Sequence, residues 1–543
     1  MSEINLAAEI KKAIRGDVAD DDNTLQTYSR DASIFLVKPK VVVFPKDEKD
    51  VEALVDFVKS RKGLSLTGRA AGTDMTGGPL TQSIVVSFTK YMNRLKKLDK
   101  THAVVEPGLY YRDLEKEMDK KSLMYPSYPA SKSLCAMGGI IANNSGGEKS
   151  LTFGKTENHV RNLKVILADG KMHELRSLNA KELKAKMAQG DFEGEIYRKM
   201  YKLCEGNYDT IQAAKPKVSK NSCGYYLWDV WDRKNFDLAK VFVGSQGTLG
   251  LWTEADIDVV PKKKHSRLVV VSFKDLKQVS SLVDIVKKYN PESLESFDKY
   301  TLELSLKFIP EISKRIHESV VSFLWGFRRE AEQALVHGIP VFIVLVEITG
   351  DRESEVQKIA DKLGKELSGN KIVNLVMKSE EEGEKFWIMR RESFNLLRNK
   401  VKDKMATPFI DDFSIKPEDL SDFVPKLYKL LQSYQIQPTL AGHVGDGNFH
   451  IIPLMDLRKK KERDKIPVVL DKFTKLVKQY HGTITAEHND GLIRTPFIER
   501  QYGSKMVKLF EETKKIFDPH NIFNPGKKVH GSIKFAMSHI KPK

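Results

Sequence analysis

At 543 residues the chain is too long for a single hydrophobic core, and ordinary domain sizes predict about two to four units. Its composition, 41% hydrophobic and 30% charged, is that of a globular protein, and three cysteines are too few and too scattered for a disulfide framework. The formal charge of +17 comes without a helix-turn-helix, a zinc-finger spacing or an aromatic RNA-binding signature, which excludes nucleic acid as the expected partner.

The first residues, MSEINLAAEIKKAIRGD, contain no apolar core of signal-peptide length and no small-residue cleavage site. The longest apolar runs, such as residues 341–346, are far shorter than the ~20 residues that span a bilayer. We therefore expect a cytoplasmic protein. The basic residues are spread through the chain and indicate a solvated surface, with a peripheral contact on anionic lipid at the inner face of the membrane as the alternative.

Short apolar strands alternate with helical segments in the first half, a pattern typical of α+β or α/β folds. The predicted elements, in chain order, are strands at 41–44 and 83–88 with a helix at 50–61 between them, a strand at 267–273, helices over 310–338, a strand at 341–348 and helices in the last sixty residues. Pro261 and the three lysines after it mark a domain boundary.

Two glycine-rich runs stand out, LTGRAAGTDMTGGP at 66–79 and MGGIIANNSGG at 137–147. Glycines let the backbone approach a ligand closely and turn its N–H groups toward an anion such as a phosphate. The first run is not a P-loop, because Gly-Pro stands where that motif needs Lys-Ser or Lys-Thr, and no GxGxxG occurs. ATP and ordinary NAD binding are therefore disfavoured. Taken alone, either run also fits a set of tight turns.

Seven motifs in order resemble the FAD-linked D-2-hydroxyacid dehydrogenases, the vanillyl-alcohol-oxidase-type group that includes D-lactate dehydrogenase, D-2-hydroxyglutarate dehydrogenase and the flavin subunit of glycolate oxidase. The motifs are LTGRAAGTDMTGG, VEPGLYYRDL, MGGIIANNSGG, GSQGTLGLWTE, GHVGDGNFH, AEHNDG and DPHNIFNPGK, spread over residues 40–528. The resemblance implies an α+β fold in three parts. They are a two-subdomain FAD-binding domain (1–262), a substrate-binding domain with an antiparallel sheet (263–457) and a largely helical C-terminal part (458–543) that carries Glu487 and His488.

The resemblance also assigns cofactor residues. Residues 69–73 are expected on the FAD pyrophosphate, and the remaining positions around the isoalloxazine and ribityl chain. The full set is Arg69, Ala70, Ala71, Gly72, Thr73, Pro129, Ser131, Gly138, Gly139, Asn143, Ser145, Gly247 and Thr248. No histidine or cysteine falls inside the first glycine run, which favours FAD held without a covalent bond.

The stretch AGHVGDGNFH places His443 and His450 symmetrically about Asp446-Gly447. An Asp-Gly pair is a hairpin signal, and a two-residue turn would put the two imidazoles opposite each other, near enough to share one cation. A cross-strand polar pair is the alternative. The run TITAEHNDG predicts a strand that ends at Glu487, a third ligand, and the resemblance implies zinc in such a site.

The resemblance suggests roles for three more residues. His488 is the candidate general base, and the alternative is a hydrogen bond that orients Glu487. Arg390, three residues after Trp387, is expected to bind the substrate carboxylate, with Arg391 in that role if the register slips by one.

Two departures from the 2-hydroxyglutarate enzymes bear on the substrate. Where those enzymes have a threonine and a lysine for a second carboxylate, this chain has Phe394 and Ile410. A dicarboxylate is therefore disfavoured, and D-lactate or a somewhat larger D-2-hydroxy acid is expected.

The run EHNDGLIRTPF resembles a subgroup whose members often continue into an iron–sulfur domain. Three scattered cysteines cannot supply a four-thiolate cluster, so electrons are expected to pass to a quinone, a cytochrome or a separate iron–sulfur protein, with oxygen left open. The predicted function is oxidation of a D-2-hydroxy acid by FAD with help from a divalent metal. The alternatives are a flavin-binding subunit that is inactive alone and a flavin-free metallohydrolase.

Overall fold

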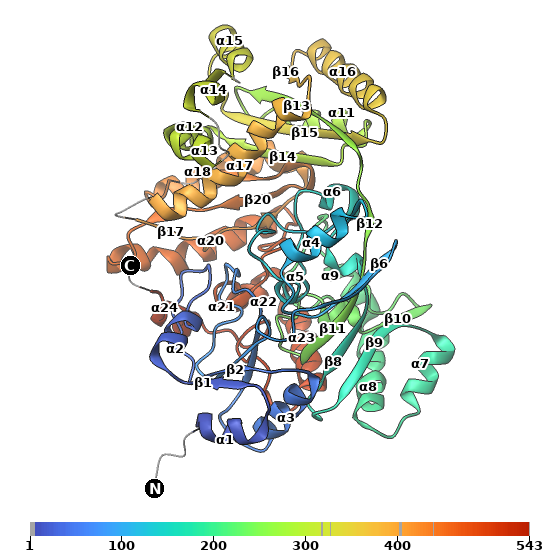
Figure 1. The fold of residues 1–543 in the computed structure, drawn as a ribbon. Coiled ribbons are helices and arrows are strands. Elements are labelled where there is room, and N and C mark those ends of the chain that lie inside the picture. The colour runs from blue at the N-terminus through green and yellow to red at the C-terminus, as the bar shows by residue number, and fades with distance from the viewer. Residues whose placement is uncertain (1–5, 316–318, 326, 401–403, 438, 542–543) are drawn as a thin grey trace.

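The structure is a computed structural model that describes residues 6–315, 319–325, 327–400, 404–437 and 439–541, except for the side chains of 304, 312, 315, 322, 324, 330, 331, 334 and 392–400. Two sheet-containing halves lie one above the other in Figure 1, and the C-terminal helices run between them. The predicted α+β class is confirmed. The three cysteines are buried and form no disulfide, as expected.

The first subdomain is a four-stranded sheet whose order is β1-β2-β4-β3, with β2, β4 and β3 parallel. The helix α3 that follows β2 begins at Asp47, whose side chain accepts hydrogen bonds from two backbone amides of the first turn. It buries the apolar stripe that includes Val51, Leu54 and Val58. The elements are α1 (Leu6–Ala13), β1 (Asp17–Ala19), α2 (Asp22–Tyr28), β2 (Val41–Phe44), α3 (Glu48–Lys59), β3 (Leu66–Arg69) and β4 (Ile84–Ser87).

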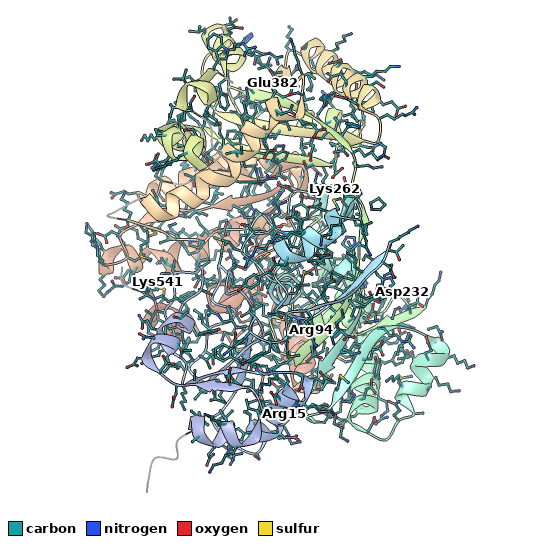
Figure 2. The ribbon with its side chains drawn as sticks, in the orientation of Figure 1. Arg15, Arg94, Asp232, Lys262, Glu382 and Lys541 are labelled. Carbon is teal, nitrogen blue, oxygen red and sulfur yellow. The ribbon has the colours of Figure 1, made fainter. Side chains whose placement is uncertain are left out.

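The second subdomain is an antiparallel six-stranded sheet of order β10-β9-β8-β11-β6-β5. Its strands are β5 (Leu95–Leu98), β6 (His102–Val105), β8 (Val160–Ile166), β9 (Met172–Asn179), β10 (Asn235–Asp237) and β11 (Leu251–Asp258). Its helices are α4 (Tyr111–Asp119), α5 (Met137–Asn143), α6 (Ser150–Phe153), α7 (Ala180–Met187), α8 (Phe192–Gly206), α9 (Tyr208–Ala214) and α10 (Ala239–Phe242). A short pair, β7 (Leu123–Met124) with β12 (Val260–Pro261), lies just before Lys262, the residue labelled at the junction of the halves in Figure 2.

The second half is built on an antiparallel seven-stranded sheet of order β16-β13-β15-β14-β19-β20-β18, as the resemblance implied. Alternate residues of β13 face opposite sides: Val269 and Val271 pack in the main core, and Leu268 and Val270 pack with Trp387. The strands are β13 (His265–Phe273), β14 (Ser293–Asp298), β15 (Phe342–Gly350), β16 (Val373–Val376), β18 (Phe413–Ser414), β19 (Leu440–His443) and β20 (Asn448–Ile451).

Helices cover this sheet and then lead to the chain end. They are α11 (Val279–Lys287), α12 (Lys299–Lys307), α13 (Ile309–Arg315), α14 (Val320–Trp325), α15 (Arg328–His337), α16 (Glu353–Gly369), α17 (Glu380–Lys400), α18 (Leu420–Ser433), α19 (Lys460–Arg463), α20 (Lys465–Gln479), α21 (Gly491–Arg494), α22 (Ile498–Tyr502), α23 (Ser504–Phe517) and α24 (Ile533–Ser538), with a two-stranded pair β17 (Met405–Ala406) and β21 (Leu454–Met455). None of the helices in the described part of the chain combines the length and apolar character that crossing a bilayer requires.

The C-terminal segment returns to the first subdomain. The Leu66 amide donates to the Ile522 carbonyl at 2.7 Å, and the Asn524 amide donates to the Leu66 carbonyl at 2.9 Å. Helix α23 stops at Phe517, just before Asp518. Residues 486–490 contact both halves, since the Glu487 amide donates to Asp412 and the Asn489 side chain donates to the Gly244 carbonyl. The domain limits at 262 and 457 stay predictions.

Candidate active site

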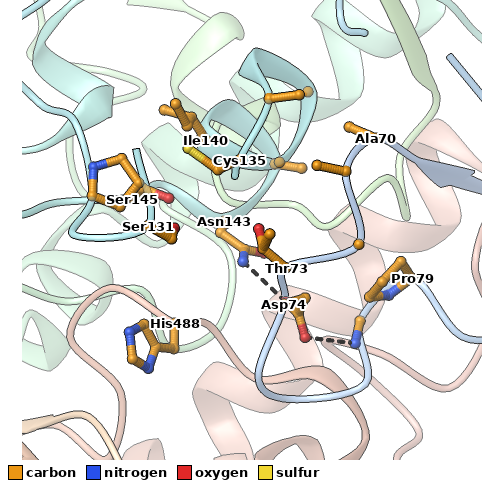
Figure 3. A pocket seen from close by; sticks show the side chains of 18 of the residues that line it. Ala70, Thr73, Asp74, Pro79, Ser131, Cys135, Ile140, Asn143, Ser145 and His488 are labelled. Carbon is orange, nitrogen blue, oxygen red and sulfur yellow. Dashed lines mark hydrogen bonds between the residues drawn. The ribbon is translucent and has the colours of Figure 1, made fainter. Parts of the chain in front are cut away.

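A cavity of about 760 Å³ lies between the glycine-rich runs and the histidine-bearing strands. Most of the predicted cofactor residues line it: Arg69, Ala70, Ala71, Gly72, Thr73, Pro129, Ser131, Gly138, Gly139, Asn143, Ser145 and Gly247. Thr248 does not, since it is fully buried and its hydroxyl donates to the Ser245 carbonyl at 2.7 Å. Figure 3 shows Ala70 and Pro79 on one side of this cavity and His488 on the other.

Asp74 holds the first glycine run in place. Its Oδ1 accepts hydrogen bonds from the amides of Thr76 (2.6 Å) and Gly78 (3.1 Å), and its Oδ2 accepts one from the Asn143 side chain at 2.9 Å, drawn in Figure 3. The loop is thereby tied to the end of α5. Arg69 donates guanidinium hydrogen bonds to the carbonyls of Tyr28 and Arg30, at and just after the end of α2, which fix its side chain in the cavity wall.

The glycines leave room for a ligand. A Cβ on Gly139 or Gly247 would meet nothing within 4 Å, so side chains there would project into the cavity. At Gly138 a Cβ would come within 2.7 Å of the Pro107 carbonyl oxygen, which shows how closely α5 approaches its neighbour. A long wall of backbone and small residues fits a flat, phosphate-bearing cofactor such as FAD.

Three imidazoles and a carboxylate gather at the other end of the cavity. His443 ends β19, His450 lies on β20, and Glu487 and His488 belong to the segment before α21. The Nε2 atoms of His443 and His450 each lie 3.2 Å from Glu487 Oε1. Four ligands held tetrahedrally at zinc–nitrogen distances lie about 3.3 Å from one another, so this spacing fits a zinc-sized ion.

The hairpin between the two histidines differs from the prediction. The connection is a four-residue turn, Val444–Gly447, in which Gly447 has φ +61°. His443 pairs with Asn448, and His450 pairs with Ala441, so the imidazoles are diagonal neighbours rather than opposite ones. The register slips by two residues, which keeps both on the same face of the sheet. Their ring centroids lie 5.4 Å apart.

The strand predicted to run from Thr483 to Glu487 does not form. Only Thr483 makes a bridge, with Ser414, and the segment then leaves the sheet. The reason is Asp412, whose Oδ2 accepts hydrogen bonds from the amides of Ala486 (2.9 Å), Glu487 (2.9 Å) and His488 (2.6 Å). A buried carboxylate thus replaces a strand partner and fixes the backbone that carries the third ligand.

Buried carboxylates also hold the far nitrogens of the imidazoles. Glu295 Oε1 lies 2.5 Å from His443 Nδ1, and Asp411 contacts Nδ1 of His450 (3.3 Å) and of His488 (2.7 Å). A neutral imidazole that donates from Nδ1 turns the lone pair of Nε2 outward. At His443 and His450 the Nε2 atom faces the Glu487 carboxylate, an arrangement that a metal cation between them, or a proton on each Nε2, would stabilise.

The pKa shifts of Glu487 and His450 also favour positive charge at this point of the cavity. Burial would raise the pKa of Glu487, but Lys220 and His443 outweigh it and hold the pKa well below its ordinary value. The Lys220 Nζ lies 3.3 Å from Glu487 Oε2 and is itself fully buried. Burial would lower the pKa of His450, yet Asp411 and Glu487 raise it to about 10, which reports a strong local preference for positive charge.

Both candidate arginines line the cavity. Arg390 is buried and pairs with Glu295, which links it to the His443 imidazole. Arg391 donates to Glu148 Oε1 at 2.8 Å. Burial would raise the pKa of Glu148, but Arg391 and the neighbouring cations lower it to about 2, so the wall carries an ionised carboxylate.

Two predicted substrate residues are not part of the wall that the structure describes. Ile410 is fully buried in the main core, beside the cavity rather than in it. The Phe394 side chain lies outside the described residues. Ile452, two residues after His450, is one of the apolar residues that line the cavity.

Four buried residues that hold the site together were not predicted from the sequence: Glu295, Asp411, Asp412 and Lys220. The adjacent pair Asp411-Asp412 at the start of β18 was a usable signal, since two buried acids in an apolar run need partners. Nothing near Glu295 or Lys220 in the sequence points to the histidines.

Comparisons with known proteins agree with this geometry. A family model described as FAD linked oxidases, C-terminal domain, matches residues 262–528, and one described as a FAD binding domain matches residues 39–176. The chain belongs to the FAD-linked oxidases, with the FAD-binding domain first and the oxidase C-terminal domain after it. The family expected from the motifs is confirmed.

Among curated relatives, D-2-hydroxyglutarate dehydrogenase of Pseudomonas putida is 28% identical over 96% of this chain and 51% of its own length. The chain therefore spans about half the length of the curated relatives that match it first. The glycolate oxidase subunit GlcD of Bacillus subtilis is 26% identical over 94% of this chain and 93% of its own length. D-lactate dehydrogenase of Anaerostipes hadrus is 23% identical, with 94% of each chain covered.

Solved structures share the fold. The 4-ethylphenol oxidase from Gulosibacter chungangensis, in its isoeugenol complex, has a TM-score of 0.66 at 15% identity, with 97% of each chain covered. Alkyldihydroxyacetonephosphate synthase has a TM-score of 0.64, also at 15% identity, over 94% of this chain and 83% of the other. At such identities the likeness concerns the fold alone, which is the vanillyl-alcohol-oxidase type.

Proposed function

We propose that this protein is an FAD-dependent dehydrogenase that oxidises a D-2-hydroxy acid to the 2-oxo acid. One observation carries the proposal: a set of two imidazoles and one carboxylate, with a third imidazole beside it, stands at one end of a glycine-lined cavity. The set of two imidazoles and one carboxylate fits a divalent metal, and the glycine-lined cavity fits FAD. The relatives named D-2-hydroxyglutarate and D-lactate dehydrogenase support the substrate class.

The chain's own residues divide the work. Arg390 would bind the substrate carboxylate, releasing part of its hold on Glu295. His488 would accept the hydroxyl proton at Nε2, since its Nδ1 is held by Asp411. The second hydrogen leaves C2 with both electrons, so the acid loses one proton and one hydride equivalent and becomes the 2-oxo acid.

Two bound groups complete the chemistry. FAD, when held by the glycine-rich wall without a covalent bond, supplies the acceptor for the two electrons. A divalent metal, zinc by the spacing of its ligands, would be held by His443, His450 and Glu487 and would lower the pKa of the substrate hydroxyl.

The proposed substrate is a D-lactate-like monocarboxylic acid rather than a dicarboxylate. Ile452 presents an apolar surface next to the ligand set, and the ionised Glu148 would repel a second carboxylate unless Arg391 leaves it. The reduced flavin would pass its electrons to an external quinone, cytochrome or iron–sulfur protein. The basic surface, with its net charge of +17, supports a peripheral contact with an anionic membrane or an acidic partner.

The test is the visible spectrum of purified protein under anaerobic conditions as D-lactate, L-lactate, D-2-hydroxyglutarate and glycolate are added in turn. We expect a yellow protein that bleaches fastest with D-lactate. Fastest bleaching by D-2-hydroxyglutarate would replace the monocarboxylate preference. A yellow protein that no acid bleaches would favour a flavin-binding subunit that is inactive alone. A protein left colourless after reconstitution with FAD would refute the proposal and leave the metallohydrolase.

A further inference from the structure

We propose that Asp411 is a positioning residue that serves two imidazoles at once. It would hold His450, a candidate metal ligand, and His488, the candidate proton acceptor, each by Nδ1. The inference rests on the proposed function and deepens it. A single carboxylate would then set both where the substrate oxygen is bound and where its proton goes.

The geometry of the three side chains carries the argument. Asp411 is completely buried. Its Oδ2 lies 2.7 Å from His488 Nδ1 in a hydrogen bond, and its Oδ1 lies 3.3 Å from His450 Nδ1 in an ion-pair contact, where neither atom has an aligned hydrogen-bond partner among the described residues. The two rings stack with centroids 4.8 Å apart and planes 19° from parallel. Because both Nδ1 edges face one carboxylate, both Nε2 edges are directed away from it. For His450, that edge reaches Glu487 Oε1 at 3.2 Å.

His488 presents its other edge to the cavity. It lines the pocket, as Figure 3 shows, and its Nε2 has no hydrogen-bond partner among the side chains that the structure describes. Because Nδ1 faces Asp411, Nε2 is the ring nitrogen of His488 that lies toward the cavity, where a substrate hydroxyl group would be bound.

The position of Asp411 is itself fixed from two sides. Its carbonyl accepts a hydrogen bond from the buried Arg494. The next residue, Asp412, has φ +66° and accepts the amides of residues 486–488. Asp412 therefore holds the backbone that carries His488, and Asp411 holds the His488 ring. Such a double attachment leaves the imidazole little freedom to turn.

The matched comparison is Glu295, a buried carboxylate that holds one imidazole, that of His443. An asparagine at 411 is uncharged and has a single acceptor oxygen, so it cannot keep both the His488 hydrogen bond and the ion-pair contact with His450. The experiment therefore compares Asp411→Asn with Glu295→Gln. Zinc affinity is measured on the FAD-loaded protein without substrate, and the rate of anaerobic flavin reduction is measured with saturating zinc and D-2-hydroxy acid.

We expect both variants to bind zinc about 10- to 100-fold more weakly, as is usual when an outer partner of a metal ligand is removed. With zinc saturating, Asp411→Asn should still reduce its flavin at least about 100-fold more slowly than the parent, because the base is misplaced. Under the same conditions, the rate of flavin reduction should fall less in Glu295→Gln than in Asp411→Asn. In Asp411→Asn/His488→Gln the rate should be no slower than in His488→Gln alone, since the first residue acts through the second.

Several results would overturn the inference. One is a zinc affinity and a rate of flavin reduction in Asp411→Asn that equal those of the parent. Another is an Asp411→Asn rate that saturating zinc restores fully. A third is a double variant in which the two losses of rate add. If no hydroxy acid reduces the parent flavin, the proposed function fails, yet the zinc comparison still tests Asp411. If Asp411→Asn does not fold, ¹⁵N spectra of the parent and His488→Gln decide: the resonance lost should be that of an Nδ1-protonated imidazole, and an Nε2-protonated one would refute the proposal.

Discussion

The two ends of the cavity are built on different principles. The cofactor end consists of backbone and small side chains, with Asp74 tying its loop to α5. The histidine end consists of charged side chains, each held by a second buried charge such as Glu295 or Asp411. Shape defines the first end, whereas paired charges define the second.

The two ends of the cavity are therefore expected to tolerate substitutions differently. A glycine wall depends on the absence of side chains, so added atoms should weaken cofactor binding and leave the ligand set intact. A network of buried charges depends on each partner, so removing one leaves another charge uncompensated. Substitutions at the two ends should therefore separate cofactor retention from chemistry.

The largest effect is expected at Glu487. In Glu487→Gln, flavin reduction by a D-2-hydroxy acid should fall at least about 1,000-fold, because a metal that polarises oxygen contributes several kcal/mol to the transition state. FAD content, read from the flavin absorbance, should stay at the parental level. Glu499→Gln, at an exposed position of α22, is the control. Full activity in the first variant would remove the metal from the mechanism.

A smaller effect is expected at Gly139, where the substitution should weaken FAD binding and leave zinc binding intact. The side chain in Gly139→Leu would enter the cavity without backbone strain, and FAD should bind about 10- to 100-fold more weakly, in line with the cost of overpacking. Zinc affinity should be unchanged. Gly190→Leu, at an exposed glycine that also has open space, is the control. Undiminished FAD binding in Gly139→Leu would place the cofactor elsewhere.

A smaller effect still is expected for Arg390→Lys, the substitution at the candidate carboxylate-binding arginine. A lysine at 390 keeps the charge beside Glu295 but loses the fork of donors, so KM for the hydroxy acid should rise about 10-fold with kcat little changed. Arg391→Lys is the matched variant, and its KM should change by less than about threefold. The reverse order would assign the substrate carboxylate to Arg391.

No effect on flavin reduction is expected at His173, which lies outside the cavity. Burial would lower its pKa, but Asp169 and Glu193 raise it to about 9. A raised pKa stabilises the fold fully below the unfolded value near 6.5, and that stability is lost as pH rises through 9. In urea unfolding, His173→Gln should lose on the order of 2 to 3 kcal/mol at pH 6 and little at pH 10. His520→Gln, at an exposed position, should show no such difference.

Much of the fold follows from local patterns. The apolar run at 41–44 and the amphipathic stretch near 50–61 became β2 and α3, because each buries an apolar face whose period is visible in the sequence. The strand at 267–273 became β13. The predictions at 443–450 and 483–491 failed in detail because a four-residue turn and the Asp412 carboxylate override the local signals.

The order of the motifs, the family and the three candidate metal ligands can be read from the sequence, and strand parity keeps His443 and His450 on one face. The residues that hold these ligands are visible only in the folded structure. Glu295 lies 148 positions from His443, and Asp411 lies 77 positions from His488. Spacing along the chain carries no information about such partners, because they meet only when the sheet and the returning C-terminal segment close around one buried site.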